Sequence, residues 1–145
     1  MNEVEHYRRL ERMYLAARIN EIYQPRIEIS EGGARIEIAL SEQLHHAAGA
    51  VHGSVYFKML DDAAFFAANS FEPDVFVLTM AFTTYLTRPV SSGALVSVGC
   101  VASRLKSQYI AEATVHDGDG NEVGRGNGIF VRSKIRLEDA AGYAG

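Results

Sequence analysis

The sequence has 145 residues, 48% of them hydrophobic and 22% charged. This length and composition predict one globular domain with its own hydrophobic core. The formal net charge of −4 argues against a general nucleic-acid-binding protein, which normally carries an excess of basic residues.

The N-terminal residues and the single cysteine indicate in which cellular compartment the protein is expected. The first residues are charged and no apolar run approaches about 20 residues, so we expect no signal peptide and no membrane-spanning segment. Cys100 is the only cysteine, which excludes an intrachain disulfide and favours a cytoplasmic protein. Because Cys100 lies in an alternating strand pattern, we expect a buried structural thiol rather than a nucleophile.

An amphipathic helix is predicted near the N-terminus. Apolar side chains recur three and four positions apart from residue 3 to about residue 20, which is the spacing of one helix face. Asn2 is expected to cap this helix, with Glu5 three residues later as in a capping box. His6 is interpreted as a surface histidine.

Alternation of apolar and polar residues predicts an antiparallel sheet. The expected strands cover residues 26–30, 34–40, 75–87, 95–105, 109–115 and 122–135. Gly32-Gly33 is a turn signal that joins the first two strands in a hairpin. Within residues 75–87, simple alternation places Phe82 and Leu86 on one face and Thr83 on the other.

The stretch from His46 to Ser70 is the most informative part of the sequence. Its second half, from Val55 onward, contains no Gly or Pro and is rich in Ala, Leu and Met, which predicts a helix. This helix is apolar nearly all the way round, so other structure must cover it. It carries Asp61 and Asp62, two carboxylates that burial would require to be paired or used in chemistry.

Two further features of this stretch suggest local interactions. Lys58 lies one helical turn before Asp62, and we interpret these two residues as a structural ion pair. Gly53 stands at the helix start, where backbone amides point outward with partial positive charge. Such a position suits a site at which negative charge develops on an oxygen atom.

One buried helix between a hairpin and long antiparallel strands predicts an α+β domain in which the sheet wraps around the helix. We assign residues 1–24 to an extra N-terminal helix and residues 25–145 to this domain. The open edges of so small a sheet favour pairing with a second copy of the chain.

The motifs of this stretch also resemble a known family. His46, Gly49, His52-Gly53-Ser54 and Asp61 follow one another in the order and spacing seen in hotdog-fold acyl-CoA thioesterases of the phenylacetate-degradation (PaaI-like) type. The similarity continues through the strand that ends at Arg88-Pro89 and covers roughly residues 25–136. Two positions depart from the pattern: Ser54 replaces a second Gly, and His46 stands where the family usually has Asn.

The resemblance implies a hotdog fold and hydrolysis of acyl-CoA to a free acid and coenzyme A. It implies that Asp61 is the nucleophile or the general base, that the Gly53 amide stabilises the oxyanion, and that His46 polarises the carbonyl group. Thr79 matches a hydroxyl position that helps to hold the attacking water. A homodimer or homotetramer with sites at the subunit interface is implied as well.

The remaining candidate residues are assigned to support and substrate binding. His52 is interpreted as shaping the loop and contacting the thioester region. Ser54 and Asp62 are placed among the substrate-binding residues, and Arg88 and Arg104 are candidates for contacts with the phosphates of coenzyme A. We expect neither a metal nor a cofactor.

Two other functions remain open from the sequence. A non-catalytic hotdog module could bind acyl-CoA as a sensor, although the retained Asp61 counts against this interpretation. A hotdog hydratase or dehydratase would need an Asp-His pair at a spacing that the sequence lacks.

Overall fold

The computed structural model describes all residues from 1 to 145. Its helices are α1 (Glu3–Ala16), α2 (Asn20–Tyr23) and α3 (Gly53–Asn69). Its strands are β1 (Arg26–Ser30), β2 (Gly33–Ala39), β3 (Val75–Leu86), β4 (Ala94–Arg104), β5 (Gln108–Asp117) and β6 (Glu122–Arg136). Two short 3-10 turns, Glu42–Leu44 and Leu137–Asp139, complete the regular structure.

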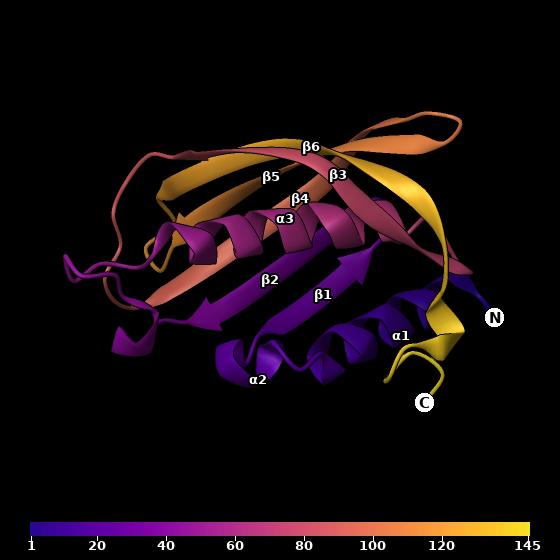
Figure 1. Ribbon diagram of the computed structural model, residues 1–145, viewed down its shortest axis with the longest axis horizontal. Helices are drawn as coiled ribbons and strands as arrows, with labels where there is room; N and C mark the ends of the chain where they lie inside the picture. The colour runs from indigo at the N-terminus through magenta and orange to yellow at the C-terminus, as the bar shows by residue number, and fades with distance from the viewer.

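The strands form one antiparallel sheet in the order β1-β2-β4-β5-β6-β3, so β1 and β3 are its two edges. The sheet curves around α3, while α1 and α2 lie beside β1 (Figure 1). This is the α+β arrangement predicted from the sequence, with a sheet wrapped around one long helix and an extra helix at the N-terminus. No helix combines the length and the apolar composition needed to cross a membrane.

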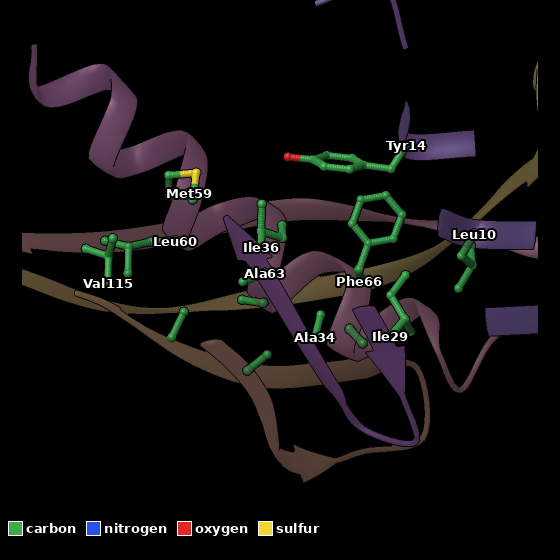
Figure 2. Packing of buried hydrophobic residues seen from close by; sticks show 14 of the residues in the cluster. Leu10, Tyr14, Ile29, Ala34, Ile36, Met59, Leu60, Ala63, Phe66 and Val115 are labelled. Atoms are coloured by element: carbon green, nitrogen blue, oxygen red, sulfur yellow. The ribbon is translucent and has the colours of Figure 1, made fainter. Parts of the chain in front are cut away.

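The fit between α3 and the sheet depends on small residues. A Cβ atom added at Gly99 of β4 would lie 2.4 Å from the backbone carbonyl of Ala63 in α3, so only glycine allows this approach. Larger apolar side chains fill the space on both sides of the contact, and those labelled in Figure 2 include Met59, Leu60 and Ile36. Because burial of such side chains is the main favourable term in folding, α3 is held firmly in place.

The N-terminal helix is shorter than predicted. Asn2 caps it as expected, because its Oδ1 accepts a hydrogen bond from the Glu5 amide at 2.8 Å. The helix ends at Ala16, and the separate helix α2 begins at Asn20. The side chain of Asn20 donates to the Tyr14 carbonyl at 2.8 Å. The Tyr14 carbonyl also accepts from the Ala17 amide at 3.2 Å, so both donors together cap the C-terminal end of α1.

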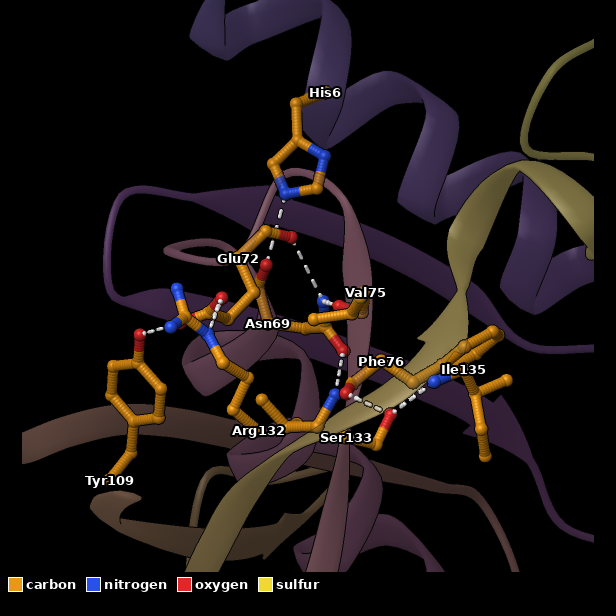
Figure 3. A network of polar contacts seen from close by, with 10 residues as sticks. His6, Asn69, Glu72, Val75, Phe76, Tyr109, Arg132, Ser133 and Ile135 are labelled. Carbon is orange, nitrogen blue, oxygen red and sulfur yellow. Dashed lines mark hydrogen bonds and ion pairs between the residues drawn. The ribbon is translucent and has the colours of Figure 1, made fainter. Parts of the chain in front are cut away.

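His6 is buried, so its interpretation as a surface histidine was wrong. Its imidazole Nε2 lies 3.0 Å from the Asn69 carbonyl and its Nδ1 lies 2.7 Å from the Tyr143 hydroxyl. The Asn69 carbonyl can only accept, so Nε2 carries the proton and Nδ1 accepts from Tyr143 in the neutral ring. Figure 3 shows how this contact joins α1 to a polar network that continues to Glu72, Arg132 and β3.

This arrangement predicts that acid weakens the docking of α1. Burial lowers the pKa of His6 from its usual value of 6.5, so an unfolded chain takes up this proton more readily than the folded one. The contribution of His6 is complete above pH 6.5 and is lost as the pH falls towards its lower folded-state pKa. We expect His6→Gln to flatten the fall in melting temperature between pH 7.5 and pH 5, whereas His116→Gln leaves that fall unchanged. An equal acid-induced fall in the wild type and His6→Gln would contradict this role.

Cys100 is exposed rather than buried, which corrects the prediction for this thiol. Its neighbours on β4 explain the difference: Ser97 and Gly99 face α3, so Cys100 points to the outer surface of the sheet. Partial burial and the nearby Glu112 carboxylate, 3.7 Å away, raise the pKa of the thiol. Such a thiol is a poor nucleophile at neutral pH.

Candidate active site

The start of α3 presents an unused backbone donor. His52 caps the helix, with its Nδ1 accepting from the Ser54 amide at 3.0 Å. The His52 carbonyl accepts from the Val55 amide at 3.0 Å. The Gly53 amide has no acceptor within the chain. An unpaired amide at the positive end of a helix dipole is a natural binding site for an anion.

A pocket of about 370 Å³ lies against this helix start. Its lining includes His46, Gly53, Tyr56, Leu86 and Arg88. A Cβ atom at Gly53 would lie 3.1 Å from Leu86 Cδ1, so the end of β3 packs directly against the start of α3. The structure therefore places Gly53, His46 and Arg88 on the lining of one pocket.

His46 can donate into this pocket. Its Nδ1 accepts from the Ala48 amide at 3.0 Å, so in the neutral ring the proton is on Nε2. The ring is exposed. A histidine held in this way supplies one N–H donor, where an asparagine amide would supply two.

Asp61 lies on the next part of α3 and faces β3. The Thr79 hydroxyl donates to its Oδ1 at 2.9 Å, and no Lys or Arg forms an ion pair with it within 4.0 Å. Burial raises the pKa of Asp61 to about 6, although the hydrogen bond from Thr79 opposes this rise. Asp61 is therefore a half-buried carboxylate that ionises near neutral pH and has no cationic partner, a common property of catalytic acids and bases.

A β-bulge explains why Thr79 reaches Asp61. The pairing of β3 with β6 shifts register between Thr79 and Ala81. Simple alternation would place Thr79 and Phe82 on opposite faces, but the bulge turns both towards α3. The side chain of Met80, within the bulge, is exposed.

Phenylalanine side chains flank Asp61 along α3. Phe57 and Phe65 lie one helical turn before and after it, on the same face of α3. The Phe57 ring packs edge-on against Phe82 at 5.7 Å between centroids, and Phe65 packs against Phe130 at 6.2 Å. Sequence reasoning missed these residues, although the i−4 and i+4 spacing around Asp61 could have indicated Phe57 and Phe65.

Asp62 occupies a different face of α3. Lys58 Nζ lies 2.6 Å from its Oδ2, which confirms the predicted ion pair. The Tyr14 hydroxyl donates to the same oxygen at 2.7 Å, and Lys58 also donates to Asn20 Oδ1 at 2.8 Å. Asp62 Oδ2 is thus held by Lys58 and by Tyr14 of α1, away from the Gly53 pocket, so we propose no substrate contact for Asp62.

Arg104 is also remote from Gly53. Its guanidinium stacks on the Phe71 ring at 3.8 Å from the centroid. Phe71 follows the C-terminal end of α3, whereas Gly53 begins the helix. Of the two arginines considered for coenzyme A, only Arg88 lies at the pocket that contains Gly53.

Gly53 and Asp61 of one chain are too far apart to act on one carbonyl group. They are separated by eight residues of continuous helix, which corresponds to ~12 Å along the helix axis. A carbonyl group in reaction needs both the attacking group and the oxyanion donor at about 3 Å. A site that uses both residues must therefore take them from different chains.

The comparisons with known proteins identify the family. The sequence profile of the thioesterase superfamily matches residues 48–123, and the chain belongs to this superfamily. Membership supports hydrolysis of an acyl thioester as the general class of reaction. No curated protein sequence matches the chain.

Solved structures show the same fold. The PaaI protein of the Escherichia coli phenylacetic acid degradation operon superposes with a TM-score of 0.83 at 18% identity, covering 92% of this chain and 97% of its own. A thioesterase family protein from Silicibacter pomeroyi gives a TM-score of 0.80 at 19% identity, covering 90% and 98%. The conserved protein PA5202 from Pseudomonas aeruginosa gives 0.76 at 22% identity, covering 84% and 98%. These similarities confirm the hotdog fold expected from the sequence.

Proposed function

We propose that the protein hydrolyses acyl-CoA thioesters, with Asp61 as the group that drives attack and the Gly53 amide of a partner chain as the oxyanion donor. The observation that carries this proposal is the state of Asp61: a half-buried carboxylate among phenylalanines, without a cation, whose pKa is raised to about 6. A structural carboxylate would be paired, as Asp62 is.

The β3 edge supports a dimer that completes this site. Apart from Thr83, its exposed side chains are apolar or aromatic, among them Met80, Tyr85 and Leu86 at 65%, 56% and 51% exposure. Thr79, beside Asp61, and Leu86, beside Gly53, lie at opposite ends of the exposed part of β3. When a strand pairs antiparallel with its own copy about a two-fold axis, one end of each strand meets the other end of its partner. Such pairing would bring Asp61 of each chain towards Gly53 of the other.

The chemistry then follows from the two residues. The Asp61 carboxylate attacks the thioester carbon directly or takes a proton from a water molecule that attacks it. In both routes negative charge develops on the carbonyl oxygen, where the Gly53 amide and the dipole of α3 stabilise it. In the direct route the carbon–sulfur bond breaks as an acyl anhydride forms on Asp61, and water then hydrolyses this anhydride to release the acid and regenerate the carboxylate. In the water route the carbon–sulfur bond breaks as the water oxygen adds, and Asp61 holds the proton taken from water. In both routes water supplies the oxygen of the free acid, and coenzyme A leaves as a thiolate that takes up a proton released by that water. Thr79 orients Oδ1, which leaves Oδ2 free to react.

Other residues at the pocket suit binding of the substrate. Arg88 supplies a positive charge beside the pocket for a phosphate of coenzyme A. His46 Nε2 supplies a donor for the thioester carbonyl or the adjoining amide. His52 and Ser54 hold the start of α3 through their mutual hydrogen bonds, so the Gly53 amide stays correctly oriented.

We expect free thiol to be released from some members of a panel of acyl-CoA thioesters, and kcat/KM to fall as the pH decreases through about 6, because Asp61 must be ionised to act. Release would be followed with a thiol-reactive dye between about pH 5 and 8.5, and Thr79→Val would move the apparent pKa upward by removing a hydrogen bond that favours the carboxylate. Binding of acyl-CoA without any thiol release would instead support a non-catalytic module.

A further inference from the structure

The two edges of the sheet differ in how their backbone groups are satisfied. At the β1 edge, Arg8 Nη2 of α1 donates to the Ile29 carbonyl at 2.7 Å. Glu11 Oε2, one turn further along α1, accepts from the Ile29 amide at 2.8 Å. The two side chains also form an ion pair at 3.0 Å. Together they give Ile29 one donor and one acceptor, as a neighbouring strand would.

The β3 edge has no such cover. Its twelve residues, Val75–Leu86, include no charged side chain, whereas β1 carries Arg26 and Glu28. From Leu78 to Leu86, no side chain of another element is hydrogen-bonded to the β3 backbone. Exposed edge strands readily pair with extended segments of other chains, and charges or covering elements prevent this pairing.

We propose that Arg8 and Glu11 mask the β1 edge against pairing with an extended strand of a second copy of this chain, so that β3 is the only edge open to assembly. The helix α1 is well placed for this role because buried Leu10 and Tyr14 anchor its other face. The masking of β1 does not depend on the reaction. Only the statement that β3 remains open for assembly rests on the dimer proposed above.

The mask also has a functional consequence. In a dimer paired through β3, an open β1 edge would let one dimer join the next through β1, and such a row of dimers need not close. Masking one edge limits the chain to the closed pairing that the proposed active site requires. The N-terminal extension is therefore a device that sets the form of the assembly rather than a part of the catalytic machinery.

The test compares two pairs of charged residues on α1 in the full-length protein. In Arg8→Ala/Glu11→Ala the mask is removed, and we expect light scattering to show a weight-average mass at least about twofold above the wild type at high protein concentration. Glu5→Ala/Arg9→Ala removes an ion pair of similar length, 2.9 Å, that does not contact β1, and should keep the wild-type mass. The conservative variant Arg8→Lys/Glu11→Gln, which keeps a donor and an acceptor, should also keep it.

A second measurement uses the wild type and does not depend on the stability of a variant. The backbone groups of Ile27 point to the same open side of β1 as those of Ile29, since they alternate along a strand, but no side chain is bonded to them. We expect the Ile29 amide to exchange its hydrogen about tenfold more slowly than that of Ile27. Equal exchange rates, or a wild-type mass for Arg8→Ala/Glu11→Ala, would overturn the proposal. So would a raised mass for Glu5→Ala/Arg9→Ala.

Discussion

Replacing Asp61 by asparagine should abolish most turnover and, at neutral pH, make the protein more stable. The amide oxygen of the new side chain can still accept the hydrogen bond from Thr79, so the local geometry is kept, but this side chain can neither attack a carbonyl carbon nor take a proton from water. We expect kcat to fall by about 1,000-fold or more, the loss that typically follows removal of a nucleophile or general base. The rate of thiol release from the best acyl-CoA substrate would measure this fall in kcat.

The stability gain follows from the raised pKa of Asp61. The folded protein holds this proton up to about pH 6, whereas the unfolded chain releases it near 3.8. Ionisation therefore favours the unfolded chain, and the cost is complete above about pH 6 and absent below about pH 4. Asp61→Asn should be more stable by about 1–2 kcal/mol at about pH 7.5 and show no gain at about pH 4. Chemical denaturation at both pH values would measure the difference.

Asp62→Asn is the matched control, and the opposite result is expected. Asp62 accepts from Lys58 and Tyr14 on another face of α3, so neutralising it leaves a half-buried lysine without its counter-charge. This variant should lose stability while keeping kcat within about tenfold of the wild type. Full activity in Asp61→Asn would remove the catalytic role from Asp61, and a loss of about 1,000-fold in Asp62→Asn only would transfer that role to Asp62.

The sequence was most informative about features of the structure that depend on residues close together along the chain. The helix over Gly53–Asn69, the antiparallel strands and the ion pair of Lys58 with Asp62 all follow from spacing along the chain, and the structure has each of them. The resemblance singled out Thr79 as a hydroxyl that helps to hold the attacking water, and the structure has this hydroxyl on Asp61 Oδ1. The wrap of the sheet around α3 followed from a helix with no polar face.

What could not be predicted depends on contacts between distant parts of the chain or on a local irregularity. His6 is buried because Tyr143, 137 positions away, and Asn69 bond to its ring. The face on which Thr79 lies is set by a β-bulge, which leaves no clear pattern in the sequence. The masking of Ile29 by side chains from α1 requires knowledge of where the helix lies relative to the sheet edge.

Replacing Gly53 by proline should remove the proposed oxyanion donor with little effect on the fold. Gly53 is the first residue of α3, the helix position at which proline is best tolerated. The preceding His52 has φ −61° and ψ 142°, which suits a residue before proline. The change deletes one amide hydrogen, and we expect a loss of about 100- to 1,000-fold in kcat. Gly53→Ala adds the same Cβ contact with Leu86 but keeps the N–H, so it should stay within about tenfold of the wild type.

A mixture of the two inactive variants tests whether the site spans two chains. Asp61→Asn supplies an intact Gly53, and Gly53→Pro supplies an intact Asp61. If each site takes these residues from different chains, every mixed dimer contains one intact site and one doubly defective site. Random pairing of equal amounts makes about half of the dimers mixed, so about one quarter of wild-type activity should return on co-refolding.

If both residues of a site came from one chain, every site in a mixed dimer would carry a defect, and activity would stay at the level of the separate variants. Because the helical rise already separates Gly53 from Asp61 by ~12 Å, that second outcome would require one of the two residues to have no direct part in the reaction.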